Sequence, residues 1–350
     1  MEGYLLLADG TRLDGVLKGA ARTATGWLVA NTAVVGFQEM VTDPTYGGAI
    51  LNFTYPEIGN VGVTEAFSES GRVQAAAVVV KVLSTCRSHY LAEDDFEEML
   101  RAAGVPCLCD VDTRGVAVHL REAGEMPAAV APSDADPAEI GRSLESFGRP
   151  VFRPSGAAEV RHAGAGPKVA VLDLGVRQSD LAQMGRCCVP ALFPFDSSED
   201  EVMSCGPSAV VISDGPAAAA PPAATVDLAR ALVGQVPVLG CGLGHVALGL
   251  ALGCKATLLK RGHHGANYPV RNVLGGEVGV TQQRHSVVLD RASVGAASGV
   301  EVVWENINDG TVEGIVAADG AAVGFQPVLA APYPGAVNAH LEQFLAGLGG

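Results

Sequence analysis

Basic residues are scarce in this sequence. Lys and Arg together number 23, against 38 Asp and Glu, and the formal net charge is −15 at pH 7. Proteins that bind nucleic acid use clustered Lys and Arg to contact phosphates, and no basic stripe is present in this chain. We therefore expect no nucleic-acid partner.

Long apolar runs are also missing. The longest apolar stretches, 74–82 and 217–224, are too short or too rich in Pro and Ala to cross a bilayer. The first residues, Met1, Glu2 and Gly3, carry no basic leader. These absences predict a cytoplasmic protein with no membrane partner.

The sequence contains eight cysteines but no CxxC pair, the spacing that is typical of zinc and redox sites. In a cytosolic chain of this length, cysteines are most often reduced and behave as small hydrophobic residues. The adjacent histidines His263 and His264 should point to opposite sides of an extended segment, which disfavours a shared metal ion. We expect no disulfide, no metal and no cofactor.

The first half of the chain predicts a β-rich α+β domain at 1–152, beginning with two strands around the turn Asp9-Gly10. A helix should open after Asp112, which is a suitable N-cap. The expected strands are 4–7, 11–15, 26–31, 49–55 and 74–83, and the expected helices are 94–103, 116–123 and 137–147.

In the second half of the chain, segments typical of apolar strands alternate with segments typical of helices. This pattern predicts an α/β domain at 167–350 with a mostly parallel open sheet, joined to the first domain by a linker at 153–166 that has no apolar period. The expected strands are 169–173, 209–213 and 236–240, and the expected helices are 178–185, 225–233 and 246–252.

Two further strand pairs are expected near the end of the chain. Segments 277–282 and 286–290 flank the polar residues 283–285, and segments 302–306 and 314–317 flank the turn Asn308-Asp309-Gly310. Both arrangements are typical of hairpins that extend a sheet.

The apolar run at 237–241 ends in a small-residue turn and then begins the helix at 246–252. A strand, elbow and helix of this kind presents a nucleophile at the apex, with backbone N–H groups converging beside it. The apex here is Gly242, which has no side chain. Cys241 lies one residue early and should face the other side of the sheet.

Several motifs in the first half resemble the small subunit of carbamoyl phosphate synthetase, and the resemblance extends over nearly the whole chain. The matching segments are Asn31-Thr32, Gly36-Phe37-Gln38-Glu39, residues 42–46, residues 54–60 and Asp112-Thr113-Arg114. The resemblance implies that the first domain faces a large, ATP-dependent subunit.

The second half resembles a class I (triad) glutamine amidotransferase domain. The segments that carry this resemblance are residues 173–176, 213–216, 240–245, 262–270 and 308–314. Members of that family hydrolyse glutamine with a Cys-His-Glu triad and pass the ammonia to the large subunit. The thiolate attacks the amide, the histidine transfers protons, the glutamate orients the histidine and backbone N–H groups hold the oxyanion.

The triad is degenerate in this chain. In the family the elbow reads Gly, aliphatic, Cys, Leu, Gly, His, Gln; laid on 240–246, this pattern places the nucleophile on Gly242. The family's His-Pro-Glu motif falls on 328–330, so the other two triad positions are Val328 and Ala330. The resemblance therefore implies a pseudoenzyme, since no catalytic residue of the triad is intact.

The glutamine pocket that the resemblance implies is also altered. Its Gln after the elbow histidine is Val246, the second Gly after its Ser-Asn-Gly-Pro is Ala217, and its Asn-His-Gly-aromatic segment is 284–287. The vestigial pocket comprises Thr45, Gly215, Ala217, Leu243, Val246, Arg284, Ser286 and Val287, of which only Thr45, Gly215 and Leu243 match the family.

These residues leave several functions open. We expect first a scaffold or ammonia-supply partner for a carbamoyl-phosphate-synthetase-type large subunit. The alternative is a repurposed enzyme or metabolite-binding protein of a specialised biosynthetic pathway, with a small-molecule ligand near Cys241, Arg284 and His285. The Arg284 guanidinium could bind an anion there, or its stem could fill the crevice. An active glutaminase ranks last.

Overall fold

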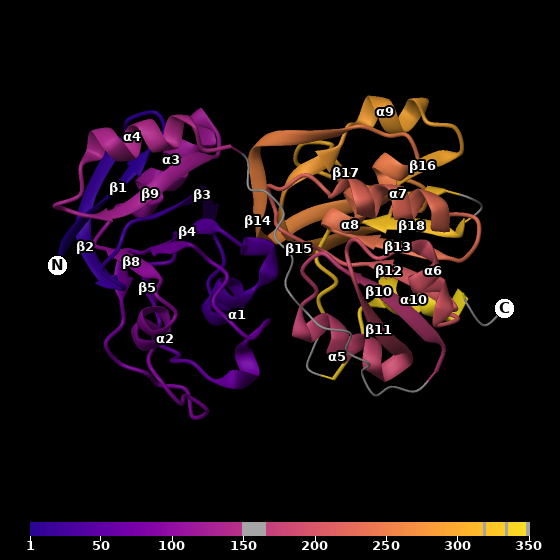
Figure 1. Ribbon diagram of the computed structural model, residues 1–350, viewed down its shortest axis with the longest axis horizontal. Helices are drawn as coiled ribbons and strands as arrows, with labels where there is room; N and C mark the ends of the chain where they lie inside the picture. Colours follow the sequence, from indigo (N-terminus) through magenta and orange to yellow (C-terminus); the bar gives the residue numbers. More distant parts are fainter. Residues whose placement is uncertain (149–165, 318–319, 333–334, 348–350) are drawn as a thin grey trace. The chain divides into compact units, whose positions relative to one another are not determined.

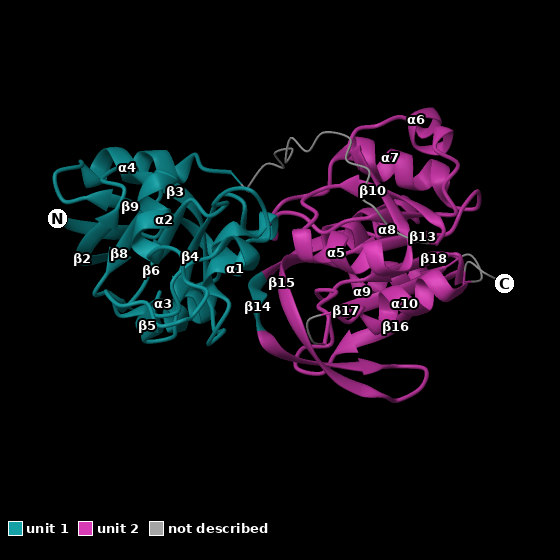
Figure 2. Ribbon diagram, turned by 90° about the horizontal axis from the view of Figure 1, so that it is seen from below, with its two compact units in different colours: residues 1–150, 260–265 teal, residues 151–259, 266–350 magenta. Residues whose placement is uncertain are grey.

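The computed structural model describes residues 1–148, 166–317, 320–332 and 335–347 (Figure 1). The chain divides into two compact units (Figure 2): unit 1 comprises Met1–Pro150 and Lys260–Gly265, and unit 2 comprises Val151–Leu259 and Ala266–Gly350. The predicted linker at 153–166 lies almost wholly outside the described residues.

Unit 1 is built on a closed barrel with the strand order β1-β2-β8-β6-β4-β3-β9. The expected first hairpin is present, because β1 and β2 pair antiparallel and Gly10 takes a positive φ of 87° in the turn between them. The barrel strands are β1 (Glu2–Leu7), β2 (Arg12–Gly19), β3 (Ala24–Asn31), β4 (Ala49–Phe53), β6 (Ala77–Val79), β8 (Pro106–Cys109) and β9 (Met126–Pro132). A separate two-stranded sheet consists of β5 (Glu57–Ile58) and β7 (Val82–Leu83).

The helices of unit 1 follow the local signals in the sequence. Asp112 accepts a hydrogen bond from the backbone N–H of Gly115, which confirms it as an N-cap. The helices are α1 (Phe37–Thr42), α2 (Phe96–Ala102), α3 (Thr113–Ala123) and α4 (Pro137–Glu145), with 3-10 turns η1 (Pro44–Tyr46) and η2 (Glu65–Phe67). The β-rich α+β architecture is as expected.

Unit 2 contains a nine-stranded sheet with the order β11-β10-β12-β13-β18-β17-β16-β14-β15. The first five of these strands run parallel, whereas β17 pairs antiparallel with β18 and with β16. The strands are β10 (Lys168–Asp173), β11 (Val189–Pro194), β12 (Ala209–Ile212), β13 (Val238–Cys241), β14 (Ala256–Asn272), β15 (Val278–Leu289), β16 (Val300–Asn306), β17 (Val312–Ala317) and β18 (Ala322–Phe325).

Both faces of the parallel strands are buried. Val210 and Ile212 of β12 belong to one apolar cluster, and Val211 between them belongs to another. This alternation places a core on each side of the sheet, as in other α/β domains. The helices are α5 (Gln178–Cys187), α6 (Glu199–Ser204), α7 (Ala223–Leu232), α8 (Leu243–Ala251), α9 (Arg291–Ala296) and α10 (Ala339–Ala346).

Two expected elements are wrong in detail. Residues 74–83 are not one strand, because β6 ends at Val79 within the barrel and β7 then pairs with β5 instead. Residues 283–285 are not a turn; they lie inside the continuous strand β15, with Gln283, Arg284 and His285 all buried. Their polarity indicated a loop, whereas the fold uses them in its interior.

Several elements were not anticipated, among them α1, α6, α9, α10, β8, β9, β11, β14 and β18. The strand β11 contains Pro190 and Pro194, which suit its place at the edge of the sheet because an edge strand has unpaired backbone positions. The short helix α6 has a capping box between Ser198 and Glu201.

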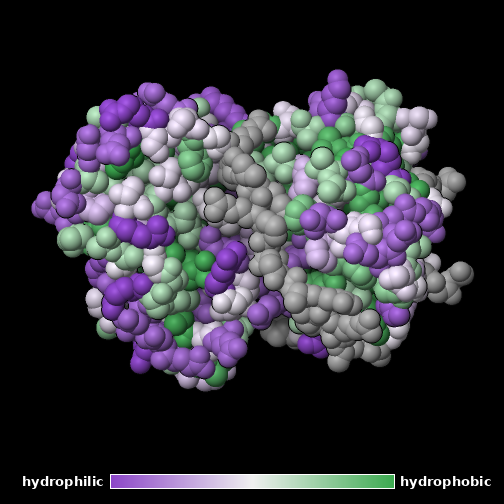
Figure 3. All heavy atoms as spheres, in the orientation of Figure 1, coloured by the Kyte–Doolittle hydropathy of each residue, from purple (hydrophilic) through white to green (hydrophobic). Residues whose placement is uncertain are grey.

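Polar and apolar residues are interspersed over the face drawn in Figure 3. None of the described helices is long and apolar enough to cross a membrane. The eight cysteines are all free thiols.

Candidate functional site

The elbow lies between β13 and α8, as the sequence predicts. Gly242 has φ 51° and ψ −113°, a conformation that side-chain-bearing residues rarely adopt. Glycines on either side allow close packing: a Cβ on Gly240 would lie 2.5 Å from the carbonyl oxygen of Gly244, and one on Gly244 would lie 2.2 Å from that of Ile212. The backbone therefore has the shape of a nucleophile elbow without the nucleophile.

Asp214, in the loop that follows β12, reaches the elbow. Its Oδ1 accepts hydrogen bonds from the backbone N–H of Gly215 over 2.8 Å and from that of Leu243 over 2.9 Å. Burial raises the pKa of Asp214 to about 6, although the two N–H donors and Arg177 oppose the rise. Sequence reasoning missed this contact, and the available signal was Asp in place of the Asn in the family's Ser-Asn-Gly-Pro motif.

The crevice under the elbow is small. It has a volume of about 10 Å³, which is room for one water molecule. Its polar lining comes from Arg177, Asp180, Ser213 and Asp214, and its remaining lining from Val176, Met184, Val211, Cys241, Gly242, Pro327, Val328 and Leu329.

A buried ion pair forms one side of this crevice. Arg177, the N-cap residue of α5, donates from Nε to Oδ2 of Asp180 over 3.0 Å and from Nη2 to Oδ1 over 2.6 Å. Both residues are less than 10% exposed. A bidentate contact of this kind satisfies the guanidinium and the carboxylate together.

Cys241 lines the same crevice as Gly242, rather than facing away from it as expected. Burial raises the pKa of the Cys241 thiol well above its usual range, and the carboxylates of Asp180 and Asp214 add to the rise. A thiol in this state is not a nucleophile at neutral pH, because the thiolate is the reactive form.

Two of the three positions predicted for the triad lie close together in the structure. Val328 lines the crevice with Gly242, and its backbone N–H donates to the carbonyl oxygen of Gln282 in β15 over 2.9 Å. Ala330 is exposed, and its carbonyl oxygen accepts a hydrogen bond from Nδ2 of Asn338. Neither residue has a group that transfers protons.

The elbow histidine, His245, is fully buried on α8. Burial lowers its pKa to about 3, which leaves the imidazole neutral at physiological pH. A Cβ on Gly324 of β18 would lie 2.4 Å from Nδ1 of His245, so this ring packs directly on the sheet. His245 therefore has a structural role within the core.

The positions predicted for the glutamine pocket are mostly buried. The N–H of Ser286 donates to the carbonyl oxygen of Ala217 over 2.9 Å, and Val246 and Val287 belong to the apolar core of unit 2. Arg284 is buried, with an exposed fraction of 6%.

Thr45 belongs to unit 1, where it is buried in η1. Its backbone N–H donates to Oδ1 of Asp43 over 2.8 Å. Asp43 therefore caps this 3-10 turn.

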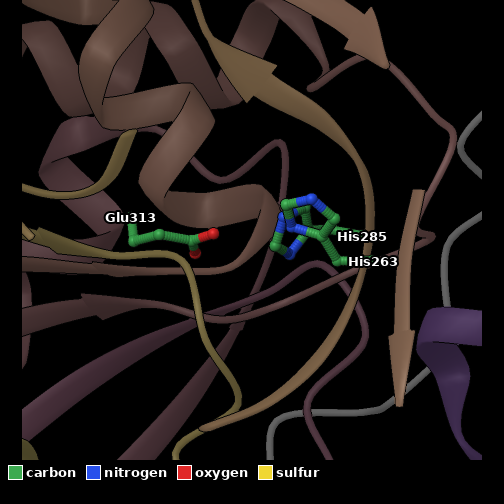
Figure 4. Close-up of side chains that lie close together, drawn as sticks. All are labelled: His263, His285 and Glu313. Carbon is green, nitrogen blue, oxygen red and sulfur yellow. The ribbon is translucent and has the colours of Figure 1, made fainter. Parts of the chain in front are cut away.

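The adjacent histidines of β14 have different partners, as their alternation predicts. Nε2 of His264 lies 3.2 Å from Oε1 of Glu125. His263 lies close to His285 of β15 and Glu313 of β17, with one ligand atom from each within 4.8 Å of the others (Figure 4). These atom types occur in zinc sites, so the expectation of no metal remains a prediction.

The Glu313 carboxylate of this cluster also accepts hydrogen bonds from two side chains near the β16–β17 turn. Its Oε1 accepts hydrogen bonds from Nδ2 of Asn306 over 3.0 Å and from Oγ1 of Thr311 over 3.3 Å. These contacts fix the carboxylate next to the β16–β17 turn, where the sequence predicts the Asn308-Asp309-Gly310 hairpin. The hairpin prediction is confirmed, since β16 and β17 pair antiparallel.

Comparison with known proteins gives consistent matches for both units. The family model described as carbamoyl-phosphate synthase small chain, CPSase domain, matches residues 5–130, and the model of class-I glutamine amidotransferase matches residues 171–326. The carbamoyl phosphate synthase small chain of Methanopyrus kandleri is 38% identical over 99% of both chains. That of Symbiobacterium thermophilum is 37% identical over 88% of both chains, and that of Bacillus caldolyticus is 32% identical over 99% of this chain and 96% of its own.

Proposed function

We propose that this chain, which belongs to the carbamoyl phosphate synthase small-chain family, no longer hydrolyses glutamine. It serves instead as a scaffold or ammonia-supply partner of an ATP-dependent large subunit. The observation that carries this proposal is the elbow itself: its backbone is in place, and Gly242 at its apex has no side chain to attack an amide.

The residues around the apex offer no replacement for the missing nucleophile. Cys241 is buried and its thiol pKa is raised. Val328 places an isopropyl group at the crevice, where an active enzyme needs a base that shares a proton with the nucleophile. The side chains that would react are therefore missing, while the strand, turn and helix that would position them are retained.

The size of the crevice favours a scaffold over an enzyme with new chemistry. The space that Gly242, Cys241 and Val328 line is about 10 Å³, which is room for one water molecule beside the apex. The retained motifs of unit 1, which match the small-chain family model over 5–130, support continued association with a large subunit.

The decisive experiment measures ammonia release from glutamine by the purified chain, with and without a candidate large subunit. We expect no release in either case, and we expect the mixture to form carbamoyl phosphate from ammonium but not from glutamine. Glutamine-dependent product that is abolished by Cys241→Ala would contradict the proposal. Cys254→Ala is the matched control, because Cys254 is equally buried but does not line the crevice.

A single reverse substitution tests whether the loss involves more than the nucleophile. Gly242→Cys alone should leave glutamine hydrolysis absent, because Val328 and Ala330 provide neither a base nor a group to orient one. Hydrolysis by this variant would show that the assignment of the other two triad positions is wrong.

A further inference from the structure

Asp214 occupies a position where a small-molecule anion would otherwise be expected. Asp214 is 8% exposed, and one oxygen of its carboxylate accepts hydrogen bonds from two backbone N–H groups, those of Gly215 and Leu243. The two donors come from different loops, one after β12 and one after β13, and they converge on a single point beside Gly242.

The geometry at this point is that of an oxyanion hole. Such a site holds the negative oxygen of an acyl-transfer intermediate with N–H donors at 2.7–3.1 Å. The distances to Oδ1 of Asp214, 2.8 and 2.9 Å, fall within that range. A carboxylate oxygen carries the same kind of charge as an oxyanion and satisfies the same donors.

The carboxylate also occupies the volume of a side chain at the apex. A Cβ built on Gly242 would lie 2.0 Å from Oδ1 of Asp214 and 2.5 Å from its Oδ2. Atoms that are not bonded do not approach this closely, so any side chain at 242 and the carboxylate in its present position exclude one another. The loss of the nucleophile made the space that Asp214 now fills.

We propose that the oxyanion hole is intact and that the carboxylate of Asp214 is its permanent internal ligand, which excludes every carbonyl substrate from the elbow. The inference rests on the proposed loss of glutaminase activity and extends it. Restoring a nucleophile, or supplying one with the substrate, does not open the hole while Asp214 remains.

Removal of the carboxylate should convert the filled hole into an anion site. In the variant Asp214→Ala, we expect sodium formate to raise the Tm by about 2–4 °C relative to equal sodium chloride, at ten times the formate dissociation constant. The wild-type chain and Asp214→Asn should show no formate-specific shift, because an Asn carbonyl oxygen still accepts both N–H groups. Absence of a formate effect on a folded Asp214→Ala chain would overturn the inference.

A second measurement uses the wild-type chain and does not depend on the stability of that variant. In an isotope-labelled sample, the amide proton resonances of Gly215 and Leu243 should shift together with one common midpoint as Asp214 titrates. In Asp214→Asn both resonances should be insensitive to pH over the same range. Independent or absent titration of the two amides in the wild type would show that they do not share this carboxylate.

These tests are separable from the test of the proposed function. Glutamine hydrolysis by the wild-type complex would disprove the loss of activity, whatever formate does. If formate does not raise the Tm of Asp214→Ala and the two amide resonances do not titrate, the proposed role of Asp214 is disproved. The proposed loss of activity is then unaffected.

Discussion

Gly242 and Asp214 form a matched pair: a Cβ on Gly242 would lie 2.0 Å from Oδ1 of Asp214, although 27 residues separate the two along the chain. The glycine provides both the empty volume and a positive φ of 51°, and the aspartate fills that volume while bonding to the amide of Leu243. The position of the Asp214 carboxylate requires a residue without a side chain at 242, and the carboxylate fills the volume that Gly242 leaves empty.

Substitutions at these two positions should therefore be strongly non-additive. Gly242→Ala should destabilise the chain by about 2–4 kcal/mol, because it combines backbone strain with a clash against the carboxylate. In an Asp214→Ala background the clash is removed, and we expect the cost to fall by at least about 1 kcal/mol. A double-mutant cycle by urea denaturation measures this coupling.

Gly244→Ala is the control for that cycle. Its Cβ would meet the backbone oxygen of Ile212 at 2.2 Å, which the Asp214 substitution does not move. Its cost should be the same in both backgrounds. Equal coupling for positions 242 and 244 would contradict a specific pairing of Gly242 with Asp214.

The raised pKa of Asp214 makes a second prediction, on the pH dependence of stability. The pKa rises from 3.8 to about 6 on burial, so the folded chain binds this proton more tightly than the unfolded chain does. Protonation stabilises the fold, and this contribution, about 3 kcal/mol, is present below pH 4 and is lost as the pH rises to 6. Arg177 and Asp180, the charged groups facing Asp214, act in opposite directions on its pKa.

The free energy of unfolding of the wild type should accordingly fall relative to that of Asp214→Asn between pH 4 and pH 6.5. Chemical denaturation of both proteins at several pH values gives this difference directly, because the other titrating groups are common to the two chains. A difference that stays constant over this range is incompatible with a buried, titrating Asp214.

The ion pair between Arg177 and Asp180 provides a third prediction. Asp180→Ala should cost about 3–5 kcal/mol, because it leaves a buried guanidinium without this carboxylate. The exposed pair Asp227 and Arg230 has the same i,i+3 spacing, with side chains 72% and 54% exposed. Asp227→Ala should cost less than about 1 kcal/mol. Similar losses in the two variants, measured by urea denaturation, would contradict a buried role for the first pair.

A fourth prediction concerns thiol reactivity. Cys241 is buried with a raised thiol pKa, so iodoacetamide at pH 8 should leave it unmodified in the folded chain. Cys86 is exposed and should be alkylated under the same conditions. Both should react in guanidinium chloride. Mass spectrometry of the peptides distinguishes them, and rapid modification of Cys241 in the folded chain would contradict a buried, unreactive thiol.

The sequence by itself determined the local structure where signals lie close together along the chain. Asp112 caps α3, the segment Asn308-Asp309-Gly310 joins two antiparallel strands, and Gly242 follows β13 at the start of α8. The motifs also identified the family, which the matches over 5–130 and 171–326 confirm. In all these cases the interacting groups are near neighbours, or the residue order alone carries the information.

Only the tertiary structure decided which side chain occupies the space beside Gly242 at the elbow. Residues 283–285 resemble a turn because they are polar, yet they lie inside β15, where Nδ2 of Asn306 in another strand donates a hydrogen bond to Oε1 of Gln283. In the same way, the pattern of residues 213–216 does not show that Asp214 bonds to Leu243. That contact depends on two loops meeting at the carboxyl ends of adjacent parallel strands, where residues distant in sequence come within hydrogen-bond distance.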